Sequence, residues 1–244
     1  MRKDHTAISD YFDDLKRVEG EILLMIAEIN PRTIVDIGIG ESTRNFVSEF
    51  MRYFVGIDID YNKVVKFINS LGALELHNLE LVCADVLHLP LRSKSIDLAV
   101  LHFVLHEIDP KRHFRVLTEV KRTAKYVLIV EPLPNGTKLY QKFWSIWRKA
   151  MSAIGRFEEY RSVEYWLQLI NQAGMHIIEK KVISWKSSVP YDVLKSLVRS
   201  WIREWMELGV PKEFVIQLEG EFLEEARTKG FRWSDVLAVM ASSQ

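Results

Sequence analysis

Two glycines follow the apolar run Ile34–Ile37 and precede a stretch with helical spacing. Gly38 and Gly40 allow the backbone to turn tightly and to approach a ligand without a Cβ in the way. The first turn of the following helix would offer unpaired N–H groups to a carboxylate or a phosphate. The segment predicts a nucleotide-type ligand, although a Gly-x-Gly pair also occurs in tight turns that bind nothing.

Three aspartates strengthen this prediction, because each lies in or directly after a run typical of a strand. Asp36 precedes the glycines, Asp58 ends the second such run, and Asp85 follows the third. The carboxyl ends of successive parallel strands face one crevice. There Asp58 would accept hydrogen bonds from ribose hydroxyls, and Asp85 would reach an adenine amino group. The alternative interpretation is that these aspartates only cap loops.

The residues around the glycines also discriminate between nucleotides. A dinucleotide fingerprint, Gly-x-Gly-x-x-Gly, needs a third glycine, and Thr43 occupies that position. The negative charge of Asp36 suits a sulfonium ligand with an ammonium group better than it suits a pyrophosphate. Both features favour S-adenosylmethionine.

The elements that must position these residues alternate between short β-branched runs and longer helical stretches. This alternation is typical of a parallel sheet with helices on its faces, that is, of an α/β protein. We expect strands at 33–37, 53–58, 79–84, 96–101, 125–131, 175–185 and 235–241, and helices at 15–29, 42–52, 61–71, 110–123, 138–153, 163–173, 191–207 and 211–229. Gly72 is expected to end the third of these helices.

The order of the motifs resembles the class I S-adenosylmethionine-dependent methyltransferases, particularly the subgroup that includes the ubiquinone and menaquinone biosynthesis enzymes. The resemblance spans roughly residues 30–135 and is carried by Val35–Gly40, Val55–Asp58, Cys83–Asp85, Leu89–Asp97 and Val104–Glu107. Two features depart from the family pattern. Ser42 replaces the third glycine of Gly-x-Gly-x-Gly, and Arg122–Lys125 replaces a Pro-Gly-Gly turn.

The resemblance implies a Rossmann-like, seven-stranded, mostly parallel sheet with helices on both faces and a helical lid or cap. We expect one domain over residues 1–244, with a core at about 30–135, 161–185 and 234–241 and helical insertions at about 136–160 and 190–230. The resemblance also implies a set of cofactor-binding residues, namely Asp36, Gly38, Gly40, Asp58, Ile59, Asp85, Val86 and Leu101.

Methyl transfer is an in-line displacement, so positioning supplies most of the acceleration, and an oxygen or nitrogen acceptor also needs a base. His106 and His102 are the candidate catalytic residues, with Glu107 and Glu131 as second choices. The alternative is that these histidines only satisfy hydrogen bonds in the core. We expect no metal, because no cluster of acids lies near the fourth strand.

An aromatic stretch lies where this subgroup carries its substrate lid, between Lys138 and Arg161. Phe143, Trp144, Trp147 and Met151 recur at spacings of three and four, so they share one helix face. They form either part of the core or a wall over an apolar or aromatic acceptor.

Composition limits the partners of the chain. The 244 residues carry 33 basic and 33 acidic side chains, so there is no basic surplus for a nucleic acid. We expect a small-molecule substrate, no DNA partner, and RNA only as an unfavoured alternative. The single cysteine, Cys83, is expected to be a buried, inert thiol.

The start of the sequence is polar and no run is long enough for a membrane span, so we expect a cytoplasmic protein. Three other functions stay open: a non-catalytic S-adenosylmethionine-binding regulator, a tRNA-modifying methyltransferase and a nicotinamide oxidoreductase.

Overall fold

The structure, a computed structural model, describes residues 2–49, 53–71 and 78–243. The chain divides into two compact units. Unit 1 comprises Met1–Glu21, Pro132–Arg161 and Val182–Val236, and unit 2 comprises Ile22–Glu131, Ser162–Lys181 and Leu237–Gln244. The division falls within helix α1 (Arg2–Ile29), so this helix contributes residues to both units. The arrangement of the whole chain as one domain stays a prediction.

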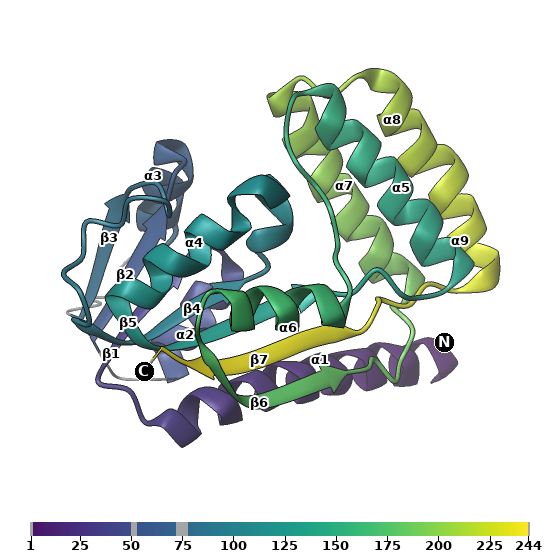
Figure 1. Cartoon of the computed structure of the whole chain (residues 1–244). Helices are drawn as coiled ribbons and strands as arrows, with labels where there is room; N and C mark the ends of the chain where they lie inside the picture. Colours follow the sequence, from purple (N-terminus) through teal and green to yellow (C-terminus); the bar gives the residue numbers. More distant parts are fainter. Residues whose placement is uncertain (1, 50–52, 72–77, 244) are drawn as a thin grey trace. The chain divides into compact units, whose positions relative to one another are not determined.

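A seven-stranded sheet organises the fold, with the strand order β3-β2-β1-β4-β5-β7-β6 (Figure 1). The pairs β1–β2, β1–β4, β2–β3 and β4–β5 are parallel, while β6 and β7 run in opposite directions. The predicted fold class, an α/β Rossmann-like sheet flanked by helices, is confirmed. The strands are β1 (Thr33–Ile37), β2 (Tyr53–Asp58), β3 (Leu79–Cys83), β4 (Ile96–His102), β5 (Ala124–Pro132), β6 (His176–Ile183) and β7 (Val236–Ser242).

The centre of the sheet is buried because its strands are apolar on both faces. In β4 the residues Leu98–Leu101 are fully buried, and in β5 the same is true of Val127–Val130. The register pairs Ile37 of β1 with Leu101 of β4, so these two strands end at the same edge. This edge receives the side chains that the sequence predicts to do chemistry.

Local sequence signals set the helices of unit 2. Asp60, Asp109 and Ser162 cap the N-termini of three helices by accepting hydrogen bonds from backbone N–H groups of the first turn. The helices are α2 (Glu41–Glu49), α3 (Tyr61–Ser70), α4 (Pro110–Thr123) and α6 (Val163–Gln172). The predicted end of α2 at residues 50–52 and the predicted helix stop at Gly72 lie outside the described residues.

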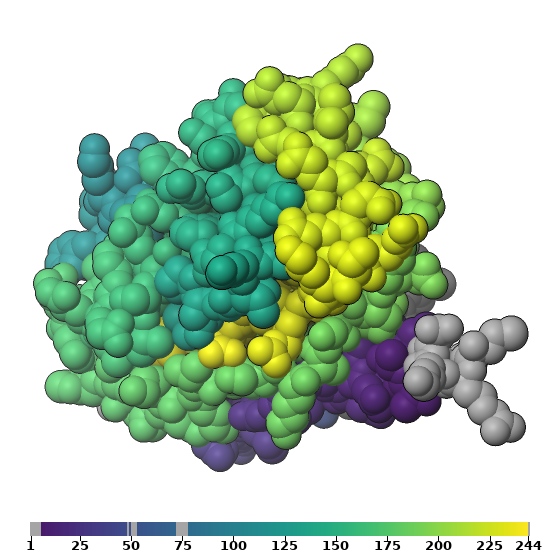
Figure 2. Space-filling view, turned by 90° about the vertical axis from the view of Figure 1, so that its right-hand side faces the viewer, coloured from purple at the N-terminus to yellow at the C-terminus, as the bar shows by residue number. Residues whose placement is uncertain are grey.

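Unit 1 is mainly helical, with α5 (Lys138–Ala153), α7 (Tyr191–Leu208), α8 (Lys212–Ile216) and α9 (Leu223–Lys229). The helix predicted over 211–229 is present, but a π-helical segment at Gln217–Phe222 interrupts it. Figure 2 shows α5 in teal beside this yellow-green and yellow stretch, in agreement with the contacts between α5 and the π-helical segment.

The aromatic stripe of α5 packs into the core of unit 1. Phe143 and Met151 are buried, and Trp144 and Trp147 pack against the same cluster. Trp147 also meets Trp205 of α7, with 5.0 Å between ring centroids. Of the two interpretations of this stripe, core packing is the one that these contacts support.

Two features differ from the sequence-based expectation. Helix α1 (Arg2–Ile29) begins well before Leu15, because its first half is held by tertiary contacts within unit 1. There Asp14 is buried and accepts hydrogen bonds from the backbone N–H groups of Lys186 and Ser187, at 2.7 and 2.9 Å. The expectation of a buried Cys83 is wrong: the thiol is exposed, because β3 is the edge strand of the sheet.

Each helix among the described residues is too short or too polar to cross a membrane.

Candidate functional site

A chain of hydrogen bonds ties Asp36 to the glycine turn. The Thr43 hydroxyl donates to Asp36 Oδ2 at 2.6 Å, and the Gly40 N–H donates to the same hydroxyl at 2.9 Å. Asp36 and Thr43 are both fully buried. From the position of the third glycine, the Thr43 hydroxyl therefore connects the strand to the turn. The sequence interpretation did not assign this role to Thr43.

The two glycines of the turn serve different needs. Gly38 has a φ of +87°, and a Cβ there would clash with Cγ2 of Val104. Its backbone N–H donates to the Ile57 carbonyl at 2.8 Å. A Cβ at Gly40 would meet nothing within 4 Å. Gly38 is thus required by the protein itself, whereas Gly40 borders open space in which a ligand can approach the backbone.

Asp58 holds the glycine turn from the neighbouring strand β2 by hydrogen bonding. Its Oδ2 accepts a hydrogen bond from the Ile39 N–H at 3.1 Å, and its Oδ1 accepts one from the Asp60 N–H at 2.8 Å. The side chain is buried to 7% exposure at the end of β2. Each carboxylate oxygen keeps further lone-pair capacity, so Asp58 can also accept hydrogen bonds from hydroxyl groups of a ligand.

The buried carboxyl of Asp36 has a strongly raised pKa. Burial, opposed by the Thr43 hydrogen bond and assisted by the nearby negative charge of Asp58, raises the pKa of Asp36 to about 7. Its Oδ1 has no hydrogen-bond partner among the residues that the structure describes. A buried acceptor without a partner is costly, and a cationic ligand nearby would relieve that cost.

Three further residues predicted to bind the cofactor follow β2 and β3. Ile59 comes directly after β2, and Asp85 and Val86 come shortly after β3. Asp85 Oδ1 accepts a hydrogen bond from the Leu87 N–H at 2.9 Å, and both Asp85 and Val86 are half-buried. The loop joins β2 through the Ala84 N–H, which donates to the Asp58 carbonyl at 3.0 Å. Ile59 is 70% exposed and offers an apolar surface beside Asp58.

Leu101 and His102 end β4 beside β1. Leu101 is fully buried in the sheet. The His102 ring packs edge-on against Phe46 of α2, with 5.7 Å between centroids, and burial lowers the pKa of His102 to about 4. His102 is therefore neutral at physiological pH and is a weak base.

His106 lies in a short 3-10 turn after β4 (Leu105–Glu107), and its Nδ1 is 2.7 Å from Oε2 of Glu131 at the end of β5. Both residues are buried, and Glu131 has no exposed surface. The pair brings together one of the two predicted bases and one of the second choices. Glu107, the other second choice, is exposed.

Phe103 between the two histidines has a strained backbone that sequence reasoning missed. Its φ is +58°, a value that bulky side chains rarely adopt. The ring is 38% exposed and lies 4.3 Å from the His102 ring and 6.4 Å from the His106 ring, between centroids. Strain of this kind occurs at functional sites, where the surrounding structure enforces it.

The structure therefore gathers most of the predicted residues at one edge of the sheet in unit 2. Asp36, the glycine turn and Asp58 form one hydrogen-bonded group, and His102 and His106 follow the adjacent β4. Asp85 and Val86 stand at the same edge but hydrogen-bond within their own loop.

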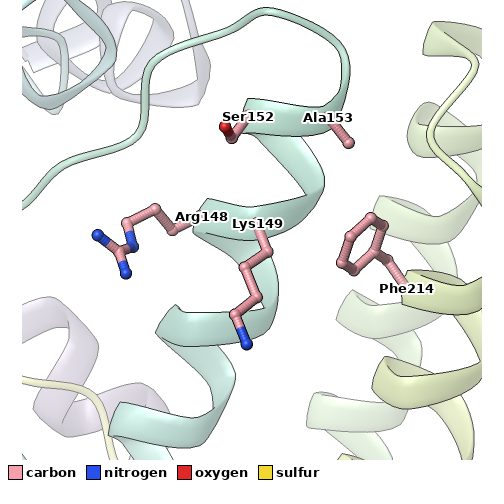
Figure 3. A pocket seen from close by; sticks show the side chains of 5 residues that line it. All are labelled: Arg148, Lys149, Ser152, Ala153 and Phe214. Atoms are coloured by element: carbon pink, nitrogen blue, oxygen red, sulfur yellow. The ribbon is translucent and has the colours of Figure 1, made fainter.

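A separate hollow in unit 1 contains none of the predicted residues. It lies between α5 and α8, has a volume of about 520 Å³ and is lined by Arg148, Lys149, Ser152, Ala153 and Phe214 (Figure 3). Arg148 and Lys149 are exposed on the helix surface. Arg148 also lies over the Trp144 ring, with its guanidinium carbon 5.5 Å from the centroid. We assign no chemistry to this hollow.

A sheet with acidic strand ends is typical of α/β proteins that bind a nucleoside-type ligand at that edge. Residues 35–126 match the family model described as "Methyltransferase domain". The enzyme class predicted from the sequence, a methyltransferase, is confirmed. The comparison with curated protein sequences finds no match.

Several solved structures share the fold of this chain. A putative sarcosine dimethylglycine methyltransferase from Galdieria sulphuraria is 15% identical, with a TM-score of 0.65 over 93% of this chain and 85% of that chain. Geranyl diphosphate C-methyltransferase from Streptomyces coelicolor, in complex with Mg²⁺, geranyl diphosphate and S-adenosyl-L-homocysteine, is 13% identical, with a TM-score of 0.55 over 87% and 74%. The [4+2]-cyclase SpnF is 14% identical, with a TM-score of 0.58 over 86% and 73%.

Proposed function

We propose that this protein transfers a methyl group from S-adenosylmethionine to a small-molecule acceptor. The observation that carries the proposal is the hydrogen-bonded group formed by Asp36, Thr43, the glycine turn and Asp58. It lies within the matched methyltransferase domain, at the carboxyl ends of β1 and β2.

The residues present fit this cofactor. Gly40 borders open space, and the unpartnered Oδ1 of Asp36 favours a ligand with positive charge. Asp58 would hold the ribose hydroxyls, and Ile59 would cover one face of the adenine. Asp85 and Val86 would contact its edge. When bound, the cofactor supplies a methyl group on a positively charged sulfur; a pyrophosphate would instead face two carboxylates.

The acceptor site would lie after β4. We infer that His106 acts as the base for an oxygen or nitrogen acceptor, because His102 has a depressed pKa. The exposed ring of Phe103 between the two histidines supports an apolar or aromatic acceptor. The resemblance to ubiquinone and menaquinone biosynthesis enzymes agrees with such an acceptor.

Calorimetry tests the cofactor. We expect S-adenosylmethionine and S-adenosylhomocysteine to bind, and NAD not to bind. Asp58→Ala should weaken S-adenosylmethionine binding by about 1–3 kcal/mol, because ligand hydroxyls lose their acceptor. Asp97→Ala is the matched control: Asp97 also accepts from two backbone N–H groups, those of Arg32 and Thr33, but at the start of β4. Equal affinities of both variants for S-adenosylmethionine would remove Asp58 from the site.

Transfer of a labelled methyl group into a cell extract tests the reaction. Label in the small-molecule fraction supports the proposal, and label in RNA would favour the tRNA-modifying alternative. Cofactor binding without transfer to any fraction would favour a non-catalytic protein or one that, like the cyclase named above, uses this fold for another reaction. Location in the cytoplasm and the absence of nucleic-acid partners stay predictions from the sequence.

A further inference from the structure

We propose that His113 is a positioning residue that holds Phe103 in its strained conformation and so keeps the Phe103 ring at the acceptor site. The inference rests on the proposed function, because Phe103 lies in the site proposed for an apolar acceptor. It is carried by the hydrogen bonds of the buried imidazole ring of His113, which reaches from α4 to the 3-10 turn after β4.

The His113 ring has hydrogen-bond partners on both of its nitrogens. Nε2 lies 2.9 Å from the carbonyl oxygen of Leu105, where the turn begins, and 3.0 Å from that of Ile108, directly after the turn. Nδ1 lies 2.9 Å from the hydroxyl oxygen of Tyr165 in α6, a helix that lies beside α4 (Figure 1). The ring has no exposed surface, so these partners come from the protein and not from water.

These partners determine which nitrogen of the neutral ring carries the proton. A carbonyl oxygen only accepts hydrogen bonds, so Nε2 must be the donor to both carbonyl groups. Nδ1 then carries the lone pair and accepts a hydrogen bond from the Tyr165 hydroxyl. The hydrogen bonds therefore run in one direction, from α6 through the His113 ring to the turn.

The backbone around Phe103 is held on its N–H side and on its carbonyl side by different groups. The Phe103 N–H donates to a carbonyl of β5 at 2.8 Å, and Glu131 accepts hydrogen bonds from the next two backbone N–H groups. His113 binds the two carbonyl groups at the ends of the turn. A positive φ at a bulky residue persists only where the surroundings enforce it, and His113 supplies the carbonyl side of that enforcement.

This arrangement predicts that His113 and Phe103 act as a unit on the acceptor. Without the donor at Nε2 the turn can relax, and Phe103 can return to the negative φ that bulky side chains prefer. Its ring would then leave the acceptor site. The group formed by Asp36, the glycine turn and Asp58 is held by its own hydrogen bonds, so the affinity for S-adenosylmethionine should stay unchanged.

The first test is ¹⁵N NMR of the imidazole rings in the wild-type protein, at a pH at which the His113 ring is neutral. The His113 signals are assigned by their loss in His113→Gln. We expect Nε2–H and an unprotonated Nδ1. His176→Leu is the matched control, because it removes an exposed histidine of β6 in the same unit, and it should leave the His113 signals unchanged.

The second test measures transfer of a labelled methyl group to the small-molecule fraction of a cell extract. At high dilution of that fraction the rate is proportional to kcat/KM. His113→Leu should lower this rate about 10-fold, the loss also expected of Phe103→Asn, and the double variant should lose little more. His113→Gln should keep most of the rate, because its amide nitrogen can donate to the same carbonyl groups. His176→Leu should keep the full rate.

The outcomes separate a positioning role from a merely structural one. Losses that multiply to about 100-fold in the double variant mean that the two residues act independently, and they overturn the proposal. A wild-type rate in a folded His113→Leu protein, or an equal loss in His113→Gln and His113→Leu, also overturns it.

The outcomes also separate this proposal from the proposed function. Failure of the wild-type protein to bind S-adenosylmethionine overturns the proposed function, whereas Nδ1–H on His113 in a protein that binds it overturns only the role of His113. The tautomer is measured in the wild-type protein without any acceptor, so this result is obtained even if His113→Leu does not fold.

Discussion

Units 1 and 2 bury very different side chains, and the difference separates packing from chemistry. The core of unit 1 is rich in aromatic rings, including Phe143, Trp205, Phe222 and Phe231, which pack among aliphatic side chains. In unit 2, the carboxyl edge of the sheet buries Asp36, Asp58, His106 and Glu131. Burying such polar groups costs free energy unless hydrogen bonds compensate for it.

The carboxylates of unit 2 show how that cost is met. Asp58 and Glu131 each accept hydrogen bonds from backbone N–H groups of the loops beside them. Asp36 differs, since one of its oxygens finds no partner among the described residues. The core of unit 1 is thus held mainly by apolar packing, while the polar edge of unit 2 shapes loops and keeps capacity for a ligand.

The largest effect is expected in the aromatic core. Trp205 is 1% exposed, and Trp205→Ala should lower the free energy of unfolding by about 3–5 kcal/mol because it leaves a cavity. The neighbouring Met206 is 70% exposed, and Met206→Ala should change stability by less than about 0.5 kcal/mol. Urea unfolding measures both. If a folded Trp205→Ala protein lost affinity for the cofactor, the core of unit 1 would contribute to binding as well as to stability.

The second-largest change in stability is expected from substitutions in the glycine turn. Gly38→Ala forces a Cβ against Val104 at a positive φ and should cost about 2–4 kcal/mol of stability. Gly40→Ala, with nothing near its Cβ, should stay within about 1 kcal/mol of the wild type and lose affinity for S-adenosylmethionine instead. Thermal unfolding and calorimetry of the pair check this. Equal stability of the two variants would contradict the different roles of the glycines.

The pH dependence of stability should report on Asp36. Its pKa is raised from 3.8 to about 7 in the folded protein, so the folded state holds a proton that the unfolded state has released. Stability is therefore lost as pH rises through this interval, by on the order of 2 kcal/mol between about pH 5 and about pH 8. Asp36→Asn should remove this contribution. Parallel stability curves for the two proteins, measured by urea unfolding, would show that the carboxyl is ionised throughout.

The smallest change in stability is expected at Phe103. Asparagine tolerates a positive φ, so in Phe103→Asn the relief of strain should offset the lost ring contacts to within about 1 kcal/mol. Steady-state kinetics should nevertheless show kcat/KM for the acceptor reduced about 10-fold, since one apolar wall of the site is gone. Phe114→Asn, at an exposed aromatic of α4, is the control and should keep full activity. An unchanged kcat/KM in Phe103→Asn would exclude its ring from the acceptor site.

Much of the sheet could be predicted because its signals are local. The bounds of β1, β2, α4 and α5 coincide with those expected from apolar periodicity and caps. Whether a strand lies at the edge or at the centre of the sheet depends on its neighbours in the fold and not on its own sequence. For this reason the sequence wrongly predicts a buried Cys83. The early start of α1 likewise depends on Asp14 reaching residues 186 and 187, far along the chain.

The candidate site shows the same limit. Asp36, Asp58 and the glycines are visible as motif positions, but the part that Thr43 plays requires knowing that its hydroxyl lies between Asp36 and Gly40. The pairing of His106 with Glu131 joins a 3-10 turn after β4 to the end of β5, 25 positions along the chain. For Phe103 there is no signal at all, because a positive φ at an aromatic residue follows from its surroundings and not from its type.

The exposed edge strand gives the protein a built-in reporter position. Cys83 is its one cysteine, and its Sγ lies 3.6 Å from the carbonyl oxygen of Ile59, next to the residue proposed to hold the ribose. A maleimide dye would thus label a single site without any mutagenesis. Its fluorescence would follow occupancy of the nearby crevice in real time, in the unaltered polypeptide.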